Sequence, residues 1–588
     1  MHTLQGIFFM YRIIILSFFS LLANEASAQQ VFLKLVQPTK NSNTVSTARQ
    51  FITGTTCKGC SVTLQDSALT VWPTGAFAAV IMLRPGDSTL RLIATDAKGA
   101  RSTQTLVYRY QLPEPEQEVT GTTVAYWRHE PAGDLQVRPG DRIAMTLKTR
   151  PGSTVQLANG WQMVEQPPTT TGGIRGIYKG EYVVQPGDAL FSATPTPLTA
   201  TIILDDGQEL QATSRSKYAL FSTETVVLQT KGRLPYLLTG LGEDRLGGTK
   251  IGYLDSLVRL SATGKVGNKY RVQLTPTQQA WIEEEHVQIL PRGSATPGAI
   301  TGNMRVWGDS TYDYVSLAVG QRLPYSSRQE LQPTRIVVDV YGAAANTNWI
   351  IQQSGYRNIQ NVHYRQAADG LVQLQIDLTD KQHWGYRVYY SGSNLIVRVK
   401  RRPPVLQLSN LVVGVDAGHG GSNTGAAGIT GVLEKNMALL LAQELQQQLQ
   451  NAGASVIMTR TTDTTYNNHD RYVFFRERDP DLLLSIHLNS STDPIYSKGI
   501  GMFYRHPGFR SLSATLLQHI VNGAGLPEYA LVGGFNFILN GFTEFPNALI
   551  ETLFVSNPEE EAKVLDPAFR KQLAAAVIKG LQQWLTQQ

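Results

Sequence analysis

The architecture of the carboxyl-terminal third follows from the sequence Leu411-Val412-Val413-Gly414-Val415-Asp416-Ala417-Gly418-His419-Gly420-Gly421. Its first residues form a short apolar run, which is typical of a buried strand. The glycines that follow let the backbone approach closely around His419. Ligands of open α/β sheets bind beyond the carboxyl ends of the strands, so the sequence predicts a strand that leads into a ligand site. A phosphate-binding P-loop is not indicated, because its Lys-Ser/Thr ending is missing.

The segment 405–588 alternates short apolar strands with helical patterns, which predicts an α/β domain with a mostly parallel sheet and flanking helices. Helices are expected from Glu434 onward, over about 509–523 and over about 567–586. The expected strands are 411–416, 454–459, 482–487, 499–504, 535–539 and 548–554.

Three more polar residues occupy positions where such a domain can carry chemistry. Glu434 begins a helix, and His487 ends an apolar strand on the same rim of the sheet as His419. Glu551 interrupts an apolar strand, where an unpaired carboxylate would be costly to bury. Taken singly, each residue also has a structural interpretation: an acid favoured in a first helical turn, a capped histidine, or a glutamate paired with an arginine.

Taken together, these four residues point to metal-dependent hydrolysis. Two histidines and one glutamate are the protein ligands of an open catalytic zinc site, in which water takes the fourth position. A second glutamate that does not bind the metal is the expected general base.

The order of these motifs resembles that of bacterial zinc-dependent N-acetylmuramoyl-L-alanine amidases, and the resemblance covers nearly all of 405–588. It implies that His419, Glu434 and His487 hold Zn²⁺ and that Glu551 is the catalytic glutamate. Two departures concern contacts with the substrate: Gly501 replaces a glutamate common in the family, and 538–541 lacks an arginine. The matching motifs are Val415-Asp416-Ala417-Gly418-His419-Gly420-Gly421, Glu434-Lys435, Thr459-Arg460, Ser485-Ile486-His487-Leu488-Asn489, Ile550-Glu551 and Phe554-Val555-Ser556-Asn557.

The resemblance implies a peptidoglycan hydrolase that cleaves the amide between N-acetylmuramic acid and the L-alanine of the stem peptide. Wall remodelling or daughter-cell separation would be its role. Two alternatives remain open: a zinc peptidase acting within the stem peptide, and a non-catalytic wall-binding scaffold. The residues between His487 and Glu551 leave little room for an inserted inhibitory helix, so an accessible site is expected.

The rest of the chain predicts several small all-β modules. Alternating strands over 30–112 resemble an immunoglobulin-like sandwich, and 118–290 is β-rich with a small barrel at about 231–290. Residues 300–402 resemble the AMIN module that precedes many cell-wall amidases. Peptidoglycan is the expected partner, and division or envelope proteins are candidate partners of the β modules.

Residues 1–28 have the pattern of a secretory signal peptide, with Ala26-Ser27-Ala28 before the cleavage point. An uncleaved anchor is the alternative, but the apolar run is short for a bilayer span. No later stretch of the sequence is long and apolar enough to cross a membrane. We therefore expect an exported, periplasmic protein, either free or associated with the wall or envelope.

Composition agrees with a globular, turn-rich chain. Hydrophobic residues make up 42% and charged residues 17%, which excludes wholesale disorder. The net charge of +6 comes without a dense Lys/Arg run, so nucleic-acid binding is not indicated. Cys57 and Cys60 lie between two alternating segments that look like hairpin strands. A local turn disulfide is favoured there over a redox or metal site, because no histidine lies near in sequence.

Overall fold

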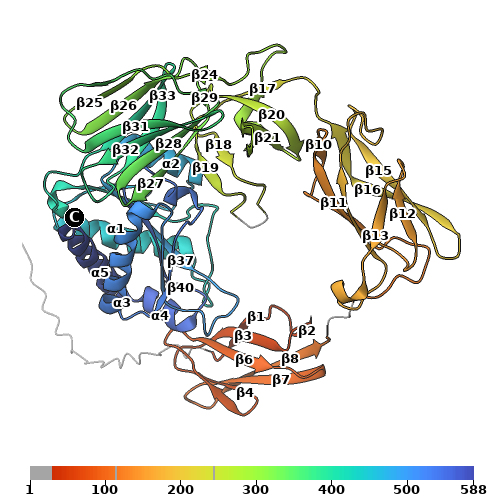
Figure 1. Cartoon of the computed structure of the whole chain (residues 1–588). Helices are drawn as coiled ribbons and strands as arrows, with labels where there is room; N and C mark the ends of the chain where they lie inside the picture. Colours follow the sequence, from red (N-terminus) through yellow and green to blue (C-terminus); the bar gives the residue numbers. More distant parts are fainter. Residues whose placement is uncertain (1–29, 113–115, 243–245) are drawn as a thin grey trace, which may run out of the picture.

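The structure is a computed structural model that describes residues 30–112, 116–242 and 246–588. The predicted signal peptide, 1–28, lies outside the described residues. The chain forms β-rich regions followed by an α/β region, and these follow one another around a ring (Figure 1). The predicted fold class is therefore confirmed. No helix among the described residues is long and apolar enough to cross a membrane.

The first β-rich region is a sandwich of two sheets. The sheet β1-β3-β6 faces the sheet β2-β8-β7-β4-β5, and Ile52, Phe77 and Leu106 lie in the apolar core that they share. Alternation of buried and exposed residues along the strands produces this one-sided burial. Strands β1 to β8 span Leu33–Gln37, Ser42–Val45, Arg49–Thr56, Ser61–Leu64, Ser67–Leu69, Ala76–Met82, Gly86–Thr95 and Arg101–Tyr110.

A disulfide joins Cys57 and Cys60 within this sandwich, as predicted. The hairpin expected around it is wrong, because β3 belongs to the three-stranded sheet and β4 to the five-stranded sheet. The disulfide turn therefore connects the two layers. Alternation identifies each segment as a strand but does not say which sheet the strand joins.

The next fifteen strands, β9 to β23, are linked by hydrogen bonds into one strongly bent sheet with two apolar cores. Its last strands, β17 to β23, form a small module in which β17 pairs with both β20 and β23. The strands span Tyr126–Glu130, Leu135–Val137, Arg142–Lys148, Thr154–Leu157, Gln162–Glu165, Ile177–Val183, Thr196–Ile203, Glu209–Leu220, Val226–Thr230, Tyr236–Leu238, Lys250–Tyr253, Arg259–Val266, Lys269–Thr275, Gln278–Glu283 and Val287–Ile289.

Strands β24 to β34 form the last β-rich region. A five-stranded sheet, β30-β25-β26-β34-β33, and a four-stranded sheet, β27-β28-β32-β31, share one apolar core with the module β17–β23. The strands span Ala299–Ile300, Met304–Gly308, Tyr312–Ala318, Tyr325–Leu331, Thr334–Tyr341, Ala343–Ala344, Ile350–Gln352, Ile359–Ala368, Leu371–Leu378, Tyr386–Ser391 and Asn394–Lys400.

The α/β region contains a six-stranded sheet in the order β36-β35-β37-β40-β38-β39, parallel except for the β38–β40 pair. Helices α1, α3 and α5 pack on one face, and α2 packs on the other. Strands β35 to β40 span Val412–Ala417, Ser455–Met458, Leu482–Asn489, Ile500–Phe503, Glu528–Val532 and Asn547–Phe554; helices α1 to α5 span Glu434–Asn451, Asn468–Arg478, Arg510–Ala524, Pro558–Leu565 and Pro567–Thr586.

Sequence periodicity located most of these elements, with two kinds of error. The strand expected at 535–539 is wrong: the fifth strand is β39, and the 3₁₀ turn Ile538–Asn540 follows it. Helices α2 and α4 were not predicted. Their N-cap residues, Asn467 and Asn557, accept hydrogen bonds from the first turn, and this capping pattern was the available signal.

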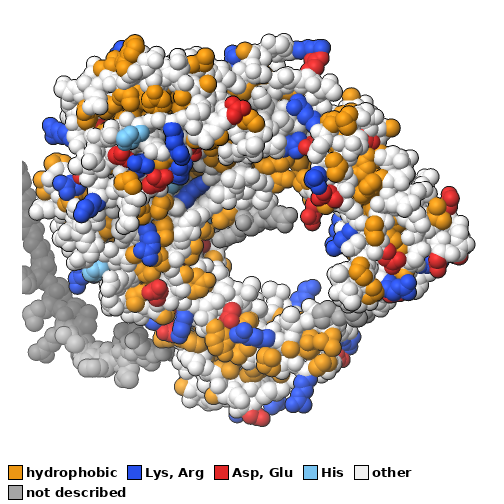
Figure 2. Space-filling model, viewed as in Figure 1, with side chains coloured by type: hydrophobic (Ala, Val, Ile, Leu, Met, Phe, Trp, Pro, Cys, Tyr) orange, Lys and Arg blue, Asp and Glu red, His pale blue; other side chains and the backbone are white. Residues whose placement is uncertain are grey.

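Side chains connect the α/β region to the β-rich regions at several places, and two of these contacts are made by Arg49 and Asp479. Arg49 of β3 lies 3.1 Å from Asp493 of the α/β region, which closes the ring. On the face seen in Figure 2, Lys and Arg side chains are scattered among acidic and uncharged ones. The other contact is made by Asp479, the residue that follows α2. Its Oδ2 accepts hydrogen bonds from Tyr312 Oη at 2.5 Å and Arg398 Nη2 at 2.8 Å.

Replacing Asp479 by alanine should weaken the contact between the α/β region and strands β26 and β34. The side chain is only 15% exposed, so its loss would leave the half-buried Arg398 and the buried Lys400 without this partner and cost about 3 kcal/mol in the free energy of unfolding. Thermal and urea unfolding of the full chain measure this loss. Glu477→Ala is the control, because its exposed pair with Arg233 should contribute less than about 1 kcal/mol. Equal effects of the two substitutions would contradict the prediction.

Candidate metal centre

Two adjacent parallel strands bring the predicted histidines together. Strand β35 pairs in parallel with β37, with Asp416 opposite Ser485, so both strands end at the same edge of the sheet. His419 follows β35 with a φ of 58°, a left-handed conformation that a non-glycine residue adopts only when its surroundings hold it. Gly418 is required beside it, because a Cβ there would lie 2.5 Å from the His487 ring.

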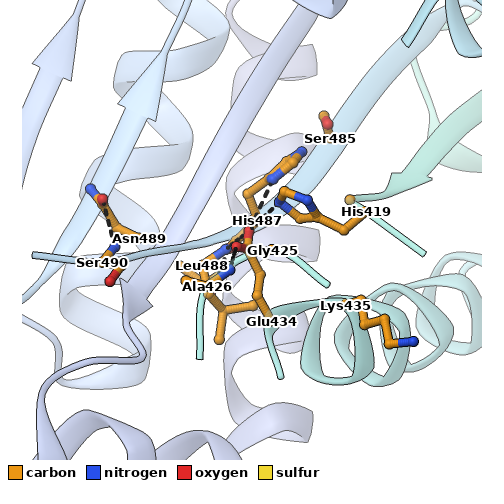
Figure 3. A network of polar contacts seen from close by, with 12 residues as sticks. His419, Gly425, Ala426, Glu434, Lys435, Ser485, His487, Leu488, Asn489 and Ser490 are labelled. Carbon is orange, nitrogen blue, oxygen red and sulfur yellow. Dashed lines mark hydrogen bonds and ion pairs between the residues drawn. The ribbon is translucent and has the colours of Figure 1, made fainter. Parts of the chain in front are cut away.

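The Glu434 carboxylate contacts both imidazoles, which lie side by side with their ring centroids 4.9 Å apart (Figure 3). Its Oε1 is 2.9 Å from His419 Nε2 and 3.1 Å from His487 Nδ1. One ligand atom from each of the three residues falls within 4.8 Å of the others. Helix α1 begins at Glu434, so the helix start places this carboxylate at the strand edge.

Hydrogen bonds fix both the carboxylate and one ring. Glu434 Oε1 accepts from the Leu488 amide at 3.0 Å, and Oε2 accepts from the Ala426 amide at 2.8 Å. His419 Nδ1 lies 2.9 Å from Asn423 Oδ1, which leaves Nε2 directed at Glu434. A second partner of this kind orients the ring of a metal-binding histidine.

The three side chains of the cluster shift one another's pKa. Burial raises the pKa of Glu434, but hydrogen bonds to His419 and His487 outweigh burial and hold the pKa far below its usual value. Burial lowers the pKa of His487, yet the bond to Glu434 and the charge of Glu551 raise it overall. The cluster is thus a carboxylate held ionised between two nitrogen donors.

Glu551 joins the same site from β40. It lies opposite His487 in the parallel pair β37–β40. The cluster and Glu551 line one open cleft of about 770 Å³. Helix α3, the helix between His487 and Glu551 in sequence, packs against α5 behind the sheet and leaves this cleft open. All four predicted residues therefore meet in one place.

The sequence did not predict the role of Arg471, which holds the backbone that leads from β35 to His419. Arg471 forms a buried ion pair with Asp416 and donates to the carbonyl oxygens of Ala417, at 2.7 Å, and of His419. Ser485 also donates to Asp416, at 2.7 Å. The available signal was Asp416 itself, because a carboxylate at the end of a buried strand requires a cation nearby.

Arg460, part of one quoted motif, completes the support. Its guanidinium donates to the carbonyl oxygens of Ala417 at 3.0 Å and of Gly418 and Lys435 at 2.7 Å each. Two buried arginines therefore hold the backbone that carries His419, and one of them also fixes the first turn of α1.

Comparison with known proteins now identifies the α/β region. The family described as N-acetylmuramoyl-L-alanine amidase matches residues 413–583. The probable cell wall amidase LytH of Staphylococcus aureus is 34% identical over 231 residues, which are 38% of this chain and 76% of that protein. This chain belongs to the N-acetylmuramoyl-L-alanine amidase family. The enzyme class expected from the sequence is thereby confirmed.

Solved structures of amidases also match. The N-acetylmuramoyl-L-alanine amidase from Clostridium difficile 630 is 30% identical; the match covers 30% of this chain and 96% of that chain, with a TM-score of 0.29. The catalytic domain of CwlV, an amidase from Bacillus (Paenibacillus) polymyxa var. colistinus, is 28% identical over 30% of this chain and 98% of that chain, with a TM-score of 0.28.

Replacing Arg471 by methionine should disorder the loop that carries His419. We expect metal affinity of the amidase to fall about 10- to 100-fold, the usual effect of losing a group that orients a metal ligand. Zinc titration of the purified chain measures the change, and circular dichroism verifies folding. Arg478→Met on the exposed face of the same helix is the control. Unchanged zinc affinity in a folded Arg471→Met chain would show that the loop is held by other contacts.

Proposed function

We propose that His419, Glu434 and His487 hold Zn²⁺ and that Glu551 is the general base of the amidase. The observation that carries the proposal is the meeting of three ligand atoms within 4.8 Å in the cleft that Glu551 lines. Two imidazole nitrogens and one carboxylate are a donor set that suits catalytic zinc and leaves a position for water. The buried negative charge of Glu434 also favours a divalent cation.

The reaction is hydrolysis of the amide between the lactyl group of N-acetylmuramic acid and the amine of L-alanine. When bound, zinc would supply acidification of water and polarisation of the scissile carbonyl. Glu551 accepts a proton from the attacking water and returns it to the nitrogen of the leaving alanine, so one carboxylate serves both halves of the reaction. Asn423 holds the His419 ring in place throughout.

The setting of this activity is the cell wall. Support comes from the predicted signal peptide at 1–28 and from the relative, which is named a probable cell wall amidase. We place the enzyme outside the cytoplasm, in the periplasm, with peptidoglycan as its substrate and wall remodelling or daughter-cell separation as its role. The AMIN-like strands β24–β34 and the immunoglobulin-like sandwich would position it on the wall or on envelope proteins.

Digestion of purified peptidoglycan by the full chain tests the reaction. The expected products are free stem peptides that begin with L-alanine, lost on chelation and restored by zinc, as mass analysis would show. Cuts within the stem peptide would instead identify a zinc peptidase. Binding to the wall without any products would identify a scaffold.

Replacing Glu551 by glutamine should lower kcat about 10²- to 10⁴-fold, the range for loss of a general base, while zinc content stays the same. Glu528→Gln is the matched control, because Glu528 is exposed on strand β39 of the same sheet. Release of L-alanine amines from peptidoglycan measures turnover. A Glu551→Gln chain with full zinc and full turnover would remove Glu551 from the mechanism.

Replacing His487 by alanine should lower zinc affinity by more than the about 10- to 100-fold that an outer-shell change causes, because a direct ligand is lost. Competition with a fluorescent chelator measures the affinity. His519→Ala on α3 is the control, since His519 lies outside the metal cluster. Equal zinc affinity of the two variants would be incompatible with the proposed ligand set.

A further inference from the structure

One wall of the catalytic cleft comes from outside the α/β region. Tyr236 and Lys250 line the cleft together with His419, His487 and Glu551. The first two residues belong to β18 and β19, which pair antiparallel in the module β17–β23. In Figure 1 these strands lie next to the α/β region, near α2. The cleft is therefore shared between two parts of the chain.

Hydrogen bonds between side chains of the α/β region and backbone groups at Gly248 and Lys250 fix this wall in place. The Lys250 amide donates to Asn536 Oδ1 at 3.1 Å, and Asn536 Nδ2 donates to the Gly248 carbonyl at 3.1 Å. Arg505 donates to the Lys250 carbonyl. Asn536 itself lines the cleft. The strand that carries Lys250 is thus bonded to the segment that forms the neighbouring part of the wall.

Apolar packing strengthens the same contact. The rings of Tyr253, on β19, and Tyr472, on α2, lie 4.7 Å apart between centroids. Leu234 lies in one buried cluster with Leu539 and Phe542. Since these groups leave water together, the module cannot move from the cleft without exposing apolar surface of both parts.

Lys250 is suited to bind an anion in the cleft. Its side chain is half-buried, and Nζ lies 5.2 Å from the centroid of the Tyr236 ring. Burial lowers the pKa of Lys250, and the charge of Arg505 lowers it further, while Glu283 acts in the opposite direction. An ammonium that has lost part of its hydration interacts more strongly with a carboxylate than an exposed one does.

The substrate offers that carboxylate on one side only. The sugars of the glycan carry N-acetyl and hydroxyl groups, and the lactyl carboxyl of N-acetylmuramic acid is consumed in the scissile amide. The stem peptide, by contrast, carries free carboxylates at its glutamate residue and at its end. A cation in the cleft wall therefore has its partner on the peptide side of the scissile bond.

We propose that Lys250, supported by Tyr236, binds a carboxylate of the stem peptide and makes the module β17–β23 a specificity element of the catalytic cleft. This inference rests on the proposed function. It also orients the substrate, because the stem peptide then runs from the metal centre toward β18 and β19 and the glycan leaves in another direction.

The test compares two soluble substrates of the full chain: an N-acetylmuramoyl stem peptide with free carboxylates, and the same molecule with every peptide carboxyl amidated. The unaltered chain should prefer the acidic substrate about tenfold in kcat/KM, the ratio that a net difference of about 1.4 kcal/mol gives. Lys250→Gln should bring the ratio close to one, mainly through KM. Lys231→Gln, an exposed lysine of the same module, is the control and should keep the preference.

Two outcomes would overturn the inference: no preference in the unaltered chain, or an equal loss of both activities in Lys250→Gln. A second measurement does not require turnover. Calorimetry with the Glu551→Gln chain should show that the acidic peptide binds about tenfold more tightly than the amidated one, and that Lys250→Gln removes this difference. If neither substrate is cleaved, the proposed reaction fails, and the binding measurement alone decides the role of Lys250.

Discussion

The buried ion pair of Asp416 and Arg471 is the constraint on which the candidate metal centre depends. His419 adopts a left-handed backbone conformation, which costs energy and persists only when neighbouring groups hold it. Arg471 supplies that hold, since it neutralises Asp416 and donates to the His419 carbonyl at the same time. Each of the two charges would be costly to bury alone. As a pair, Asp416 and Arg471 hold the loop that carries His419.

The parallel sheet explains why the other functional residues meet this loop. Strands β35, β37 and β40 are neighbours and run in the same direction, so their carboxyl ends place His419, His487 and Glu551 along one edge. Helix α1 returns to that edge at Glu434. The Glu434 carboxylate contacts the rings of both histidines because Gly425 leaves room for it. A Cβ at position 425 would lie 2.5 Å from Glu434 Oε2.

Sequence reasoning could identify this site because His419, Glu434 and His487 stand near a strand end or at a helix start, and such positions can be read from local periodicity. Glu551 could be identified because it interrupts an apolar strand. It failed where the fold depends on partners distant in sequence. The alternation around Cys57 predicted strands correctly but not their separate sheets. The segment 535–539 was predicted as a strand, yet it runs into the 3₁₀ turn Ile538–Asn540, and Phe535, Asn536 and Phe537 line the cleft. Arg471 was not singled out because helix α2 carries several other charged residues.

Lys250 shows the same limit most clearly, because its amide bonds to Asn536, which is 286 residues away. No local pattern marks a lysine in one β module as part of a cleft in another region.

The position of Lys250 also bears on the smallest active unit of the protein. A fragment of 405–588 would contain all four chemical residues, but it would lose the wall formed by β18 and β19 and expose Tyr472, Leu539 and Phe542, which pack beneath it. The cleft at the candidate metal centre is therefore formed by the amidase region and its adjoining β module together.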